Sequence, residues 1–328
     1  MAVLTLGEAE ELAAAALQRC RVSDANAALV AKALVRAEAE GLASHGLLRL
    51  PIYAAQTRNG KIDGYAVPVV TQPRPALIAI DAKNGFAFPA LKEAAQTLPR
   101  IAREHGIAAA GISRSHHCGV AGHHVLGLAE AGMMGVLFAN APAAIAPWGG
   151  TRAVFGTDPI AFACPLPGRE TIVVDLSLSK VARGHILSAV RKGEQIPEDW
   201  ALDSNGKPTS DPEAALLGTM VPLGDAKGTA LALMVELLAA GLTGSNFAPD
   251  ATSFLDAEGP PPGTGQLMIA IDVSGFGIDP SHLLRMAQAI EEQPGARLPG
   301  SRRAGALRRA EQHGLNISDT LYAEIAAL

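Results

Sequence analysis

The sequence has little cysteine and no long apolar run. It contains three cysteines, Cys20, Cys118 and Cys164, and none of them belongs to a CxxC pair. This odd, scattered set argues against a disulfide framework. No stretch approaches the roughly 18 uninterrupted apolar residues of a membrane helix, and the first residues lack the basic and apolar regions of a secretion signal. We therefore expect a cytoplasmic, reducing setting and no membrane partner.

Aromatic side chains are also scarce, at 4% of the 328 residues, although 48% of the chain is hydrophobic. The core must therefore be built from small aliphatic side chains with close backbone packing. The net charge is -5, and no basic run is longer than the pairs Arg302-Arg303 and Arg308-Arg309. Nucleic acid is consequently not expected as a partner. The length allows one large or two ordinary domains.

Several nucleotide-binding and catalytic motifs are missing. No GxGxxG segment follows a predicted strand, which excludes the ordinary Rossmann fingerprint. Neither the GxxxxGK[ST] loop of P-loop proteins nor the GxSxG turn of serine hydrolases is present. A dinucleotide, if one binds, must therefore be held in another way.

Two short segments contain most of the chemically informative residues. Residues 113–124 (SRSHHCGVAGHH) hold four of the nine histidines, and residues 44–49 read SHGLLR. Ser44 can hydrogen-bond His45 and set its tautomer, which suits proton donation near neutral pH. Arg49, four residues further on, can hold a carboxylate with two hydrogen bonds. Together the segments indicate the reactive centre of an enzyme that acts on a small carboxylate.

The histidine cluster has other interpretations. Because His116, His117 and Cys118 are consecutive, an extended chain cannot direct all three to one ion, and no HExxH segment is present. No metal site is therefore predicted. A purely structural alternative is a helix start with buried, hydrogen-bonded histidines. A catalytic or cofactor-contacting role is favoured over both, with Cys118 filling space.

Hydrophobic periodicity and turn residues predict a mixed chain of helices and strands. The segment 107–112 (IAAAGI) is a buried strand that delivers the histidine cluster at its end, where function is often found. Residues 141–167 are rich in loops and line a cleft. Helices are predicted at 5–19, 25–40, 52–59, 89–104, 123–132, 176–192, 227–242, 281–292 and from 301, and strands at 67–71, 76–81, 107–112, 134–140, 171–175 and 265–273.

Segments spread over almost the whole chain resemble the malate/L-lactate dehydrogenase family that lacks a Rossmann fold. This family includes ureidoglycolate and sulfolactate dehydrogenases and Δ1-piperideine-2-carboxylate/Δ1-pyrroline-2-carboxylate reductase. Each segment alone is weak evidence for the resemblance, but nine segments in the same order as in the family are a strong signal. They are SHGLLRLP at 44–51, NGFA at 84–87, SHHCG at 115–119, PWGG at 147–150, FGTDPIAFACP at 155–165, VVDLSLS at 173–179, ARGH at 182–185, KG at 227–228 and RLPG at 297–300.

The resemblance implies an α/β fold of the α+β type and a homodimer. A large, mainly antiparallel sheet would form a non-Rossmann NAD(P)-binding domain over residues 121–295. A helical domain on the substrate side would combine residues 1–120 with residues 296–328. The active site would lie between the domains, near the subunit interface.

The resemblance also implies roles for individual residues. Ser44 and His45 would form the proton relay, with His45 the acid in reduction, and Arg49 would hold the substrate carboxylate. His117 would accept a proton or neighbour the cofactor, and Thr157 would contact the substrate. The residues expected to contact NADPH or NADH are His116, His117, Gly119, Asn140, Asp175, Leu176, Ser177, Lys227, Gly228, Pro299, Gly300 and Arg303.

One position departs from the family pattern and bears on the substrate. After the glycine that matches Gly184, the imine-reducing members carry aspartate and the malate and ureidoglycolate types carry lysine, whereas this chain has His185. As a catalytic residue, His185 can act as a cation or as a neutral relay partner. Arg183, with Gly184 on the substrate side, adds positive charge. The pattern favours reduction of a 2-oxo acid to a 2-hydroxy acid of the malate, lactate or sulfolactate type.

Two alternatives stay open for the reaction. The segments MVELLAAGLTGSNF and GQLMIAID are close to the imine-reductase version, which favours cyclic 2-imino acids as substrates. The histidine cluster motivates a more remote alternative, a non-redox, metal-dependent lyase. The choice between NADH and NADPH is also open, because no acidic residue stands at a Rossmann position to bind the ribose. Arg302 and Arg303 can bind a 2′-phosphate, and a solvated surface pair is an equal alternative.

Overall fold

The centre of the molecule is a seven-stranded sheet of order β2-β3-β4-β10-β5-β6-β7, seen in a computed structural model that describes residues 2–328. Every pairing is antiparallel except that of β3 with β4. This confirms the predicted large, mainly antiparallel sheet. The strands are β2 (Val69–Arg74), β3 (Leu77–Asp81), β4 (Ile107–Ser115), β5 (Met133–Ala139), β6 (Ile160–Cys164), β7 (Ile172–Leu176) and β10 (Thr264–Asp272).

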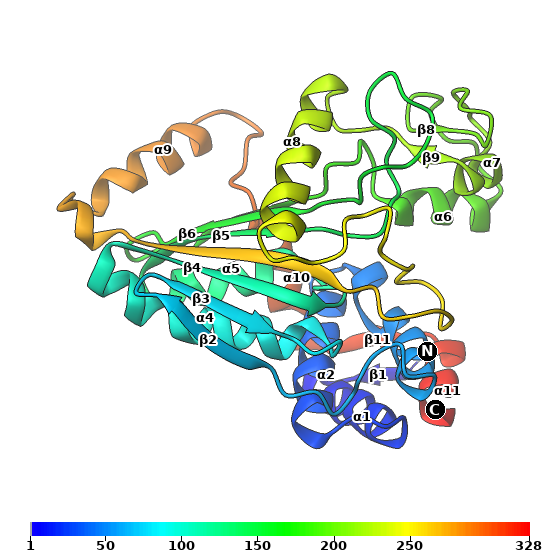
Figure 1. Cartoon of the computed structure of the whole chain (residues 1–328), viewed down its shortest axis with the longest axis horizontal. Helices are drawn as coiled ribbons and strands as arrows, with labels where there is room; N and C mark the ends of the chain where they lie inside the picture. Colours follow the sequence, from blue (N-terminus) through cyan, green and yellow to red (C-terminus); the bar gives the residue numbers. More distant parts are fainter. Residues whose placement is uncertain (1) are drawn as a thin grey trace.

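Small side chains allow two helices to lie close against this sheet. Helices α4 (Ala87–His105) and α5 (Ala121–Glu130) cover one of its faces (Figure 1), and alanines such as Ala108 and Ala110 of β4 are fully buried beneath them. A Cβ atom on Gly135 would lie only 2.9 Å from Cδ1 of Leu128 on α5. The alanine-rich and glycine-rich composition thus builds a dense core without aromatic rings.

Segments from both halves of the chain form a second, helical layer. In Figure 1 the blue N-terminal and red C-terminal elements lie side by side, and β1 (Ala2–Leu4) pairs antiparallel with β11 (Leu315–Ile317). Thr5 and Glu8 form a capping box at the start of α1. The remaining elements of this layer are α1 (Leu6–Arg19), α2 (Asp24–Ala39), η1 (Ala43–His45), η2 (Leu47–Arg49), α3 (Leu50–Arg58), α10 (Ser301–His313) and α11 (Asp319–Ala327).

The remaining elements lie on the other side of the sheet or at its edge (Figure 1). Helix α8 continues directly into η3, a π-helical turn. None of the helices within residues 2–328 is long and apolar enough to cross a bilayer. These elements are α6 (Arg183–Lys192), β8 (Ala201–Leu202), α7 (Pro212–Leu217), β9 (Thr219–Met220), α8 (Ala226–Glu236), η3 (Leu237–Gly241), η4 (Ser274–Phe276) and α9 (Ser281–Glu291).

Two predicted segments differ from the structure. The helix predicted at 176–192 begins only at Arg183, because Leu176 still belongs to β7 and the chain then turns. The region 141–167, predicted as loops, contains β6, which pairs with β5 and β7. Its five residues are enclosed by Pro159 and Pro165 and owe their strand conformation to these partners, which no local pattern reveals.

The sheet also crosses the predicted domain boundary. Strands β2, β3 and β4, which fall in the segment 1–120, pair in one sheet with the strands of the segment 121–295. The helical layer itself comes from both ends of the chain, as expected. A division into two domains stays a prediction.

Candidate active site

Ser44 and His45, which the SHGLLR segment predicts to be a proton relay, lie in the short helical turn η1, and we call this pair the relay. Oγ of Ser44 and Nδ1 of His45 are 3.1 Å apart. The turn is tight because Gly46 packs against α2, where a Cβ atom would lie 3.1 Å from the Cα atom of Glu38. The Glu38 carboxylate also accepts a hydrogen bond from the backbone N–H of Leu47 at 3.0 Å. The contacts of Gly46 and Leu47 with α2 thus fix the turn that carries Ser44 and His45.

Arg49 reaches back toward the same turn. Its Nε donates a hydrogen bond to the backbone oxygen of Ser44 at 2.7 Å. Its Nη1 is buried and has no hydrogen-bond partner within residues 2–328. A buried guanidinium donor without an acceptor is unfavourable unless a ligand supplies one. The structure therefore brings Ser44, His45 and Arg49 together and leaves a donor free for an anion.

His117, at the end of β4, lies beside this relay. Its ring centroid is 5.4 Å from that of His45, and its Nδ1 is 2.7 Å from Oη of Tyr53 on α3. The Phe254 ring covers it, with centroids 5.3 Å apart. Tyr53 is absent from the predicted site residues, although it stands four positions after Arg49, a spacing that places two side chains on one face of a helix.

The other three histidines of the cluster have different surroundings. His116 is buried against Phe254, and neither of its ring nitrogens has a partner. His123 Nε2 is 2.9 Å from Oε2 of Glu40, and His124 Nε2 is 2.7 Å from the backbone oxygen of Cys118. His123 and His124 thus fit the structural alternative, in which hydrogen-bonded histidines stand at the start of a helix. Within residues 2–328 no group of three or more histidine, cysteine, aspartate or glutamate side chains is arranged to hold a metal ion.

Burial controls the protonation of the relay. It lowers the pKa of His45 to about 4, assisted by the charge of Arg49 and partly opposed by that of Asp175. Burial, again with Arg49, also holds the pKa of His117 well below its usual value. Both rings are therefore neutral at neutral pH in the ligand-free chain. This differs from the expectation for His45, because the sequence pattern does not reveal that the side chain is buried beside a guanidinium.

The start of α6 faces the relay from another direction. A Cβ atom on Gly184 would lie 3.5 Å from Cβ and 3.6 Å from Oγ of Ser44. The neighbouring Arg183 has a buried Nε without a partner. His185 is exposed, and its ring lies against Trp200 with a centroid distance of 6.4 Å. The structure thus brings Gly184 to the relay, whereas the His185 ring contacts a tryptophan.

Thr157 and Asn140 border a buried acidic pair. Asn140 is fully engaged inside the protein: its Nδ2 donates to Oε2 of Glu236 at 3.3 Å, and its Oδ1 accepts from the N–H of Gly265 at 2.9 Å. Asp158, which directly follows Thr157, is completely buried. Burial and the nearby Glu236 raise the pKa of Asp158 well above its usual value. The raised pKa favours the neutral, protonated form of Asp158.

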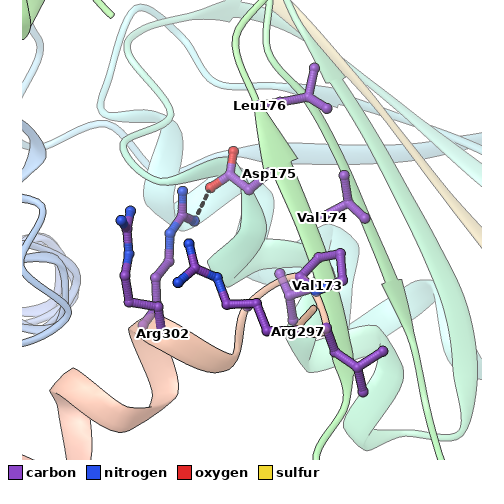
Figure 2. A pocket seen from close by; sticks show the side chains of 10 residues that line it. Val173, Val174, Asp175, Leu176, Arg297 and Arg302 are labelled. Atoms are coloured by element: carbon purple, nitrogen blue, oxygen red, sulfur yellow. Dashed lines mark hydrogen bonds and ion pairs between the residues drawn. The ribbon is translucent and has the colours of Figure 1, made fainter. Parts of the chain in front are cut away.

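A second part of the site lies between β7 and the start of α10. A hollow of about 280 Å³ opens beside Asp175, which forms an ion pair with Arg303 at 2.7 Å. Figure 2 shows Arg297 and Arg302 extending to the side on which the Asp175 carboxylate lies. Neither has an ion-pair partner within residues 2–328. Three arginines and a single carboxylate thus line this hollow, which leaves excess positive charge for a phosphate.

Glycine permits this close approach of the chain to β7. Gly300 has φ of 90°, and a Cβ atom there would lie 3.2 Å from the backbone oxygen of Val173. The hollow continues into a groove of about 710 Å³ that reaches His123 and Arg36. Pro299 and Gly300 line both. An extended ligand can therefore lie along this surface.

Charge couples the groove to the proton relay. Asp175 raises the pKa of His45 and Arg303 lowers it, so both lie within electrostatic reach of that ring. The relay and the arginine-rich hollow therefore belong to one site. Its dimensions and charge suit a small anion at Arg49 and a phosphate-bearing ligand at Arg303.

The remaining predicted cofactor residues are distributed more widely. Leu176 lines the hollow, and Ser177 hydrogen-bonds Ser179 at 3.0 Å. Gly119 has φ of 68° in the loop after the histidines. Lys227 and Gly228 begin α8 and line neither the hollow nor the groove.

Known proteins resemble this chain over nearly its whole length. A profile of the family described as malate/L-lactate dehydrogenase matches residues 4–326. The (2R)-3-sulfolactate dehydrogenase (NADP(+)) of Chromohalobacter salexigens is 50% identical over 326 residues, covering 99% of this chain and 97% of that protein. A Delta(1)-pyrroline-2-carboxylate reductase of Ancylobacter novellus is 37% identical over 333 residues, with the same coverage of 99% and 97%.

A solved structure agrees with the sequence relatives. The delta1-piperideine-2-carboxylate reductase of Pseudomonas syringae pvar. tomato has a TM-score of 0.91 to this chain at 35% identity, and the match covers 100% of this chain and 99% of that one. These findings confirm the predicted fold and the predicted class, an NAD(P)-dependent dehydrogenase or reductase. The chain belongs to the malate/L-lactate dehydrogenase family.

Proposed function

We propose that this chain reduces a 2-oxo acid that carries a second acidic group to the corresponding 2-hydroxy acid. The sulfonate of a 3-sulfolactate-type substrate and the second carboxylate of malate are such groups. The observation that carries the proposal is a pair of buried guanidinium donors without partners, Nη1 of Arg49 and Nε of Arg183. Gly184, which follows Arg183, lies against Ser44 of the relay. Nη2 of Arg183 donates to the backbone oxygen of Leu216 at 3.4 Å, and we infer that its free Nε binds the second acidic group of a substrate held at Arg49.

The residues of the relay have distinct tasks in this reaction. Arg49 binds the carboxylate next to the reacting carbon, and His45, oriented by Ser44, delivers a proton to the oxygen on that carbon. In the ligand-free chain, burial and the positive charge of Arg49 lower the pKa of His45. A bound carboxylate offsets this charge. Anion binding therefore favours protonation of His45 at the moment when an acid is needed. In the reverse direction His45 is the base.

The hollow beside Asp175 fits a nicotinamide dinucleotide. When bound, the reduced nicotinamide supplies the hydride. Arg303 and the unpaired Arg297 and Arg302 would hold its phosphates, and the glycine at position 300 leaves room for them beside β7. Three arginines at one hollow favour NADPH over NADH, because NADPH carries one more phosphate. Thr157 as a substrate contact, Asn140 and the pair Lys227-Gly228 as cofactor contacts, and His185 as a catalytic residue stay predictions.

Reduction of cyclic 2-imino acids is the second candidate. The 37% identity to a Delta(1)-pyrroline-2-carboxylate reductase favours it. Such a substrate carries a single carboxylate and would leave Arg183 without an anion. The two candidates therefore differ in the number of acidic groups that they bring to the site.

Steady-state turnover separates these candidates. Consumption of NADPH or NADH is followed with pyruvate, oxaloacetate, sulfopyruvate, Δ1-pyrroline-2-carboxylate and Δ1-piperideine-2-carboxylate. We expect the highest kcat/KM with NADPH and a dianionic oxo acid. Turnover of the cyclic imines alone would refute the proposal in favour of the second candidate. Absence of any turnover, together with no quenching of NADPH fluorescence on mixing, would refute a redox function.

A homodimer is the expected assembly, and the surface of α8 supports it. Isolated apolar side chains are common on protein surfaces, but a contiguous group usually marks an interaction site. We infer that a second copy covers this surface. Leu233→Glu should convert the dimer to monomers in sedimentation, whereas Leu217→Glu, at an exposed site on α7, should not; a monomeric wild type would refute the inference. The exposed apolar residues on α8 and just after it are Leu231, Leu233, Met234, Leu237, Leu242 and Phe247.

The cellular setting stays a prediction. The three cysteines are buried and unpaired, which is compatible with a reducing, cytoplasmic environment. Localisation of a tagged chain by fractionation tests it.

A further inference from the structure

Tyr53 is the residue that holds His117 in place. It is completely buried on α3, and its hydroxyl has one partner within residues 2–328, Nδ1 of His117 at 2.7 Å. The other ring nitrogen, Nε2, has no protein partner and is not fully buried. The ring therefore presents one nitrogen to Tyr53 and the other to the open side of the site.

The direction of this hydrogen bond follows from elimination. If Nδ1 carried the hydrogen, it would donate to the tyrosine oxygen, and the buried hydroxyl hydrogen of Tyr53 would have no acceptor. If Tyr53 donates, both groups are satisfied and the hydrogen of the neutral ring sits on Nε2. Burial raises the pKa of Tyr53, so the hydroxyl keeps its proton. Burial also keeps His117 neutral.

The surroundings prevent the ring from turning over. Helix α3 and the turn after it hold the loop that carries Phe254: Gln56 Nε2 donates to the backbone oxygen of Asp256 at 2.7 Å, and the buried Lys61 binds the Asp256 carboxylate at 2.6 Å. The Phe254 ring packs on His117. The same helical segment thus supplies the hydrogen-bond donor and anchors the covering ring.

We propose that Tyr53 is a positioning residue that fixes His117 as its Nε2–H tautomer, so that His117 donates a hydrogen bond to the bound substrate and does not accept a proton. The inference deepens the proposed function and rests on it. The two neighbouring rings then have different roles. His45 transfers the proton, and His117 stabilises the bound substrate by donating a hydrogen bond to it. It also replaces the expectation that His117 is a proton acceptor.

The tautomer can be measured without turnover. In the ¹⁵N-histidine-labelled full-length chain, long-range ¹H–¹⁵N spectra distinguish the two nitrogens of each ring, and His117→Gln assigns the signals of His117. We expect an unprotonated Nδ1 in the wild type and a mixed or reversed tautomer in Tyr53→Phe. A protonated Nδ1 in the wild type, or an unchanged tautomer in Tyr53→Phe, overturns the proposal.

Kinetics tests the consequence for the reaction. Tyr53→Phe removes only a hydroxyl, and we expect kcat to fall about 10- to 100-fold, as for groups that orient metal-bound histidines. The Kd of NADPH should stay within about twofold, and the pH dependence of kcat, set by His45, should keep its shape. Tyr65→Phe, at an exposed tyrosine, is the matched control and should match the wild type. An unchanged kcat in Tyr53→Phe overturns the proposal.

The two proposals fail in different ways. If the wild type turns over no substrate of the panel, the proposed function fails, while the NMR result still decides the tautomer. If the wild type is active and Tyr53→Phe alters neither tautomer nor kcat, only the role of Tyr53 fails. Should Tyr53→Phe unfold, Tyr53→His, which keeps a donor-capable ring, is tested for recovery of the tautomer; folded protein without recovery overturns the proposal.

Discussion

Replacement of Arg49 by methionine tests the carboxylate clamp most directly. The side chain has one free buried donor, Nη1, and one donor, Nε, committed to the backbone of Ser44. Loss of one partner of a desolvated, hydrogen-bonded ion pair costs about 2–5 kcal/mol. At 1.36 kcal/mol per factor of ten, kcat/KM should fall roughly 30- to 5,000-fold, mainly through KM.

Lysine at the same position separates charge from geometry. It keeps the positive charge but cannot reproduce the planar fork or the Nε bond to Ser44. The loss of one charge-assisted hydrogen bond, about 1.5–3 kcal/mol, corresponds to a reduction of roughly 10- to 150-fold. Arg49→Lys should therefore lie between the wild type and Arg49→Met.

The assay compares an oxo acid with its neutral amide. Steady-state kcat and KM are measured for both, and the Kd of NADPH and the thermal midpoint serve as controls for cofactor binding and folding. Because the amide brings no charge, its kcat/KM should differ little between the wild type and Arg49→Met. A KM for the oxo acid that is unchanged in Arg49→Met, or an equal loss for acid and amide, would show that Arg49 does not bind the carboxylate.

Four further results are expected. His45→Ala should lose most turnover and keep NADPH binding; near-normal kcat would remove His45 from the relay. Since the pKa of His45 is about 4, kcat/KM for reduction should fall as pH rises above about 4, and a flat profile up to about pH 8 would exclude His45 as the acid. Arg303→Met should raise the Kd of NADPH roughly 10- to 150-fold through the loss of a charge-assisted contact, measured by fluorescence titration; an unchanged Kd would place the cofactor elsewhere. The unfolded chain releases the Asp158 proton near the ordinary pKa of about 4, whereas the folded chain keeps this proton to higher pH because the pKa of Asp158 is raised. The free energy of unfolding should therefore fall as pH rises from about 4 toward the raised pKa. Asp158→Asn should flatten this slope in denaturant titrations, and an unchanged slope would contradict the raised pKa of Asp158.

Contacts within a short segment could be predicted from the sequence. Ser44, His45 and Arg49 lie within six residues, so local geometry decides whether they meet. Their spacing is a weak signal by itself, and the family resemblance selected them. The strand predicted at 107–112 is also present, because a run of small aliphatic residues bounded by a turn is a local signal. It extends to Ser115, two residues before His117, and alternate residues of it are buried.

Contacts between distant segments could not be predicted from patterns. Tyr53 meets His117 across 64 positions, and Asp175 meets Arg303 across 128. No periodicity encodes such pairs, and the family resemblance named Asp175 and Arg303 without showing that they bind each other. The low pKa of His45 was also out of reach, because it depends on burial that only the assembled structure reveals.

The pairing of β1 with β11 has a consequence for synthesis of the chain on the ribosome. All seven strands of the large sheet precede residue 273, so this core can form while later residues are still being made. The layer that carries Ser44 and His45 closes only when residues 315–317 arrive to join β1, and Arg303 is supplied shortly before them. A nascent chain can thus be largely folded and yet inactive, because the elements made first and last meet at the catalytic layer.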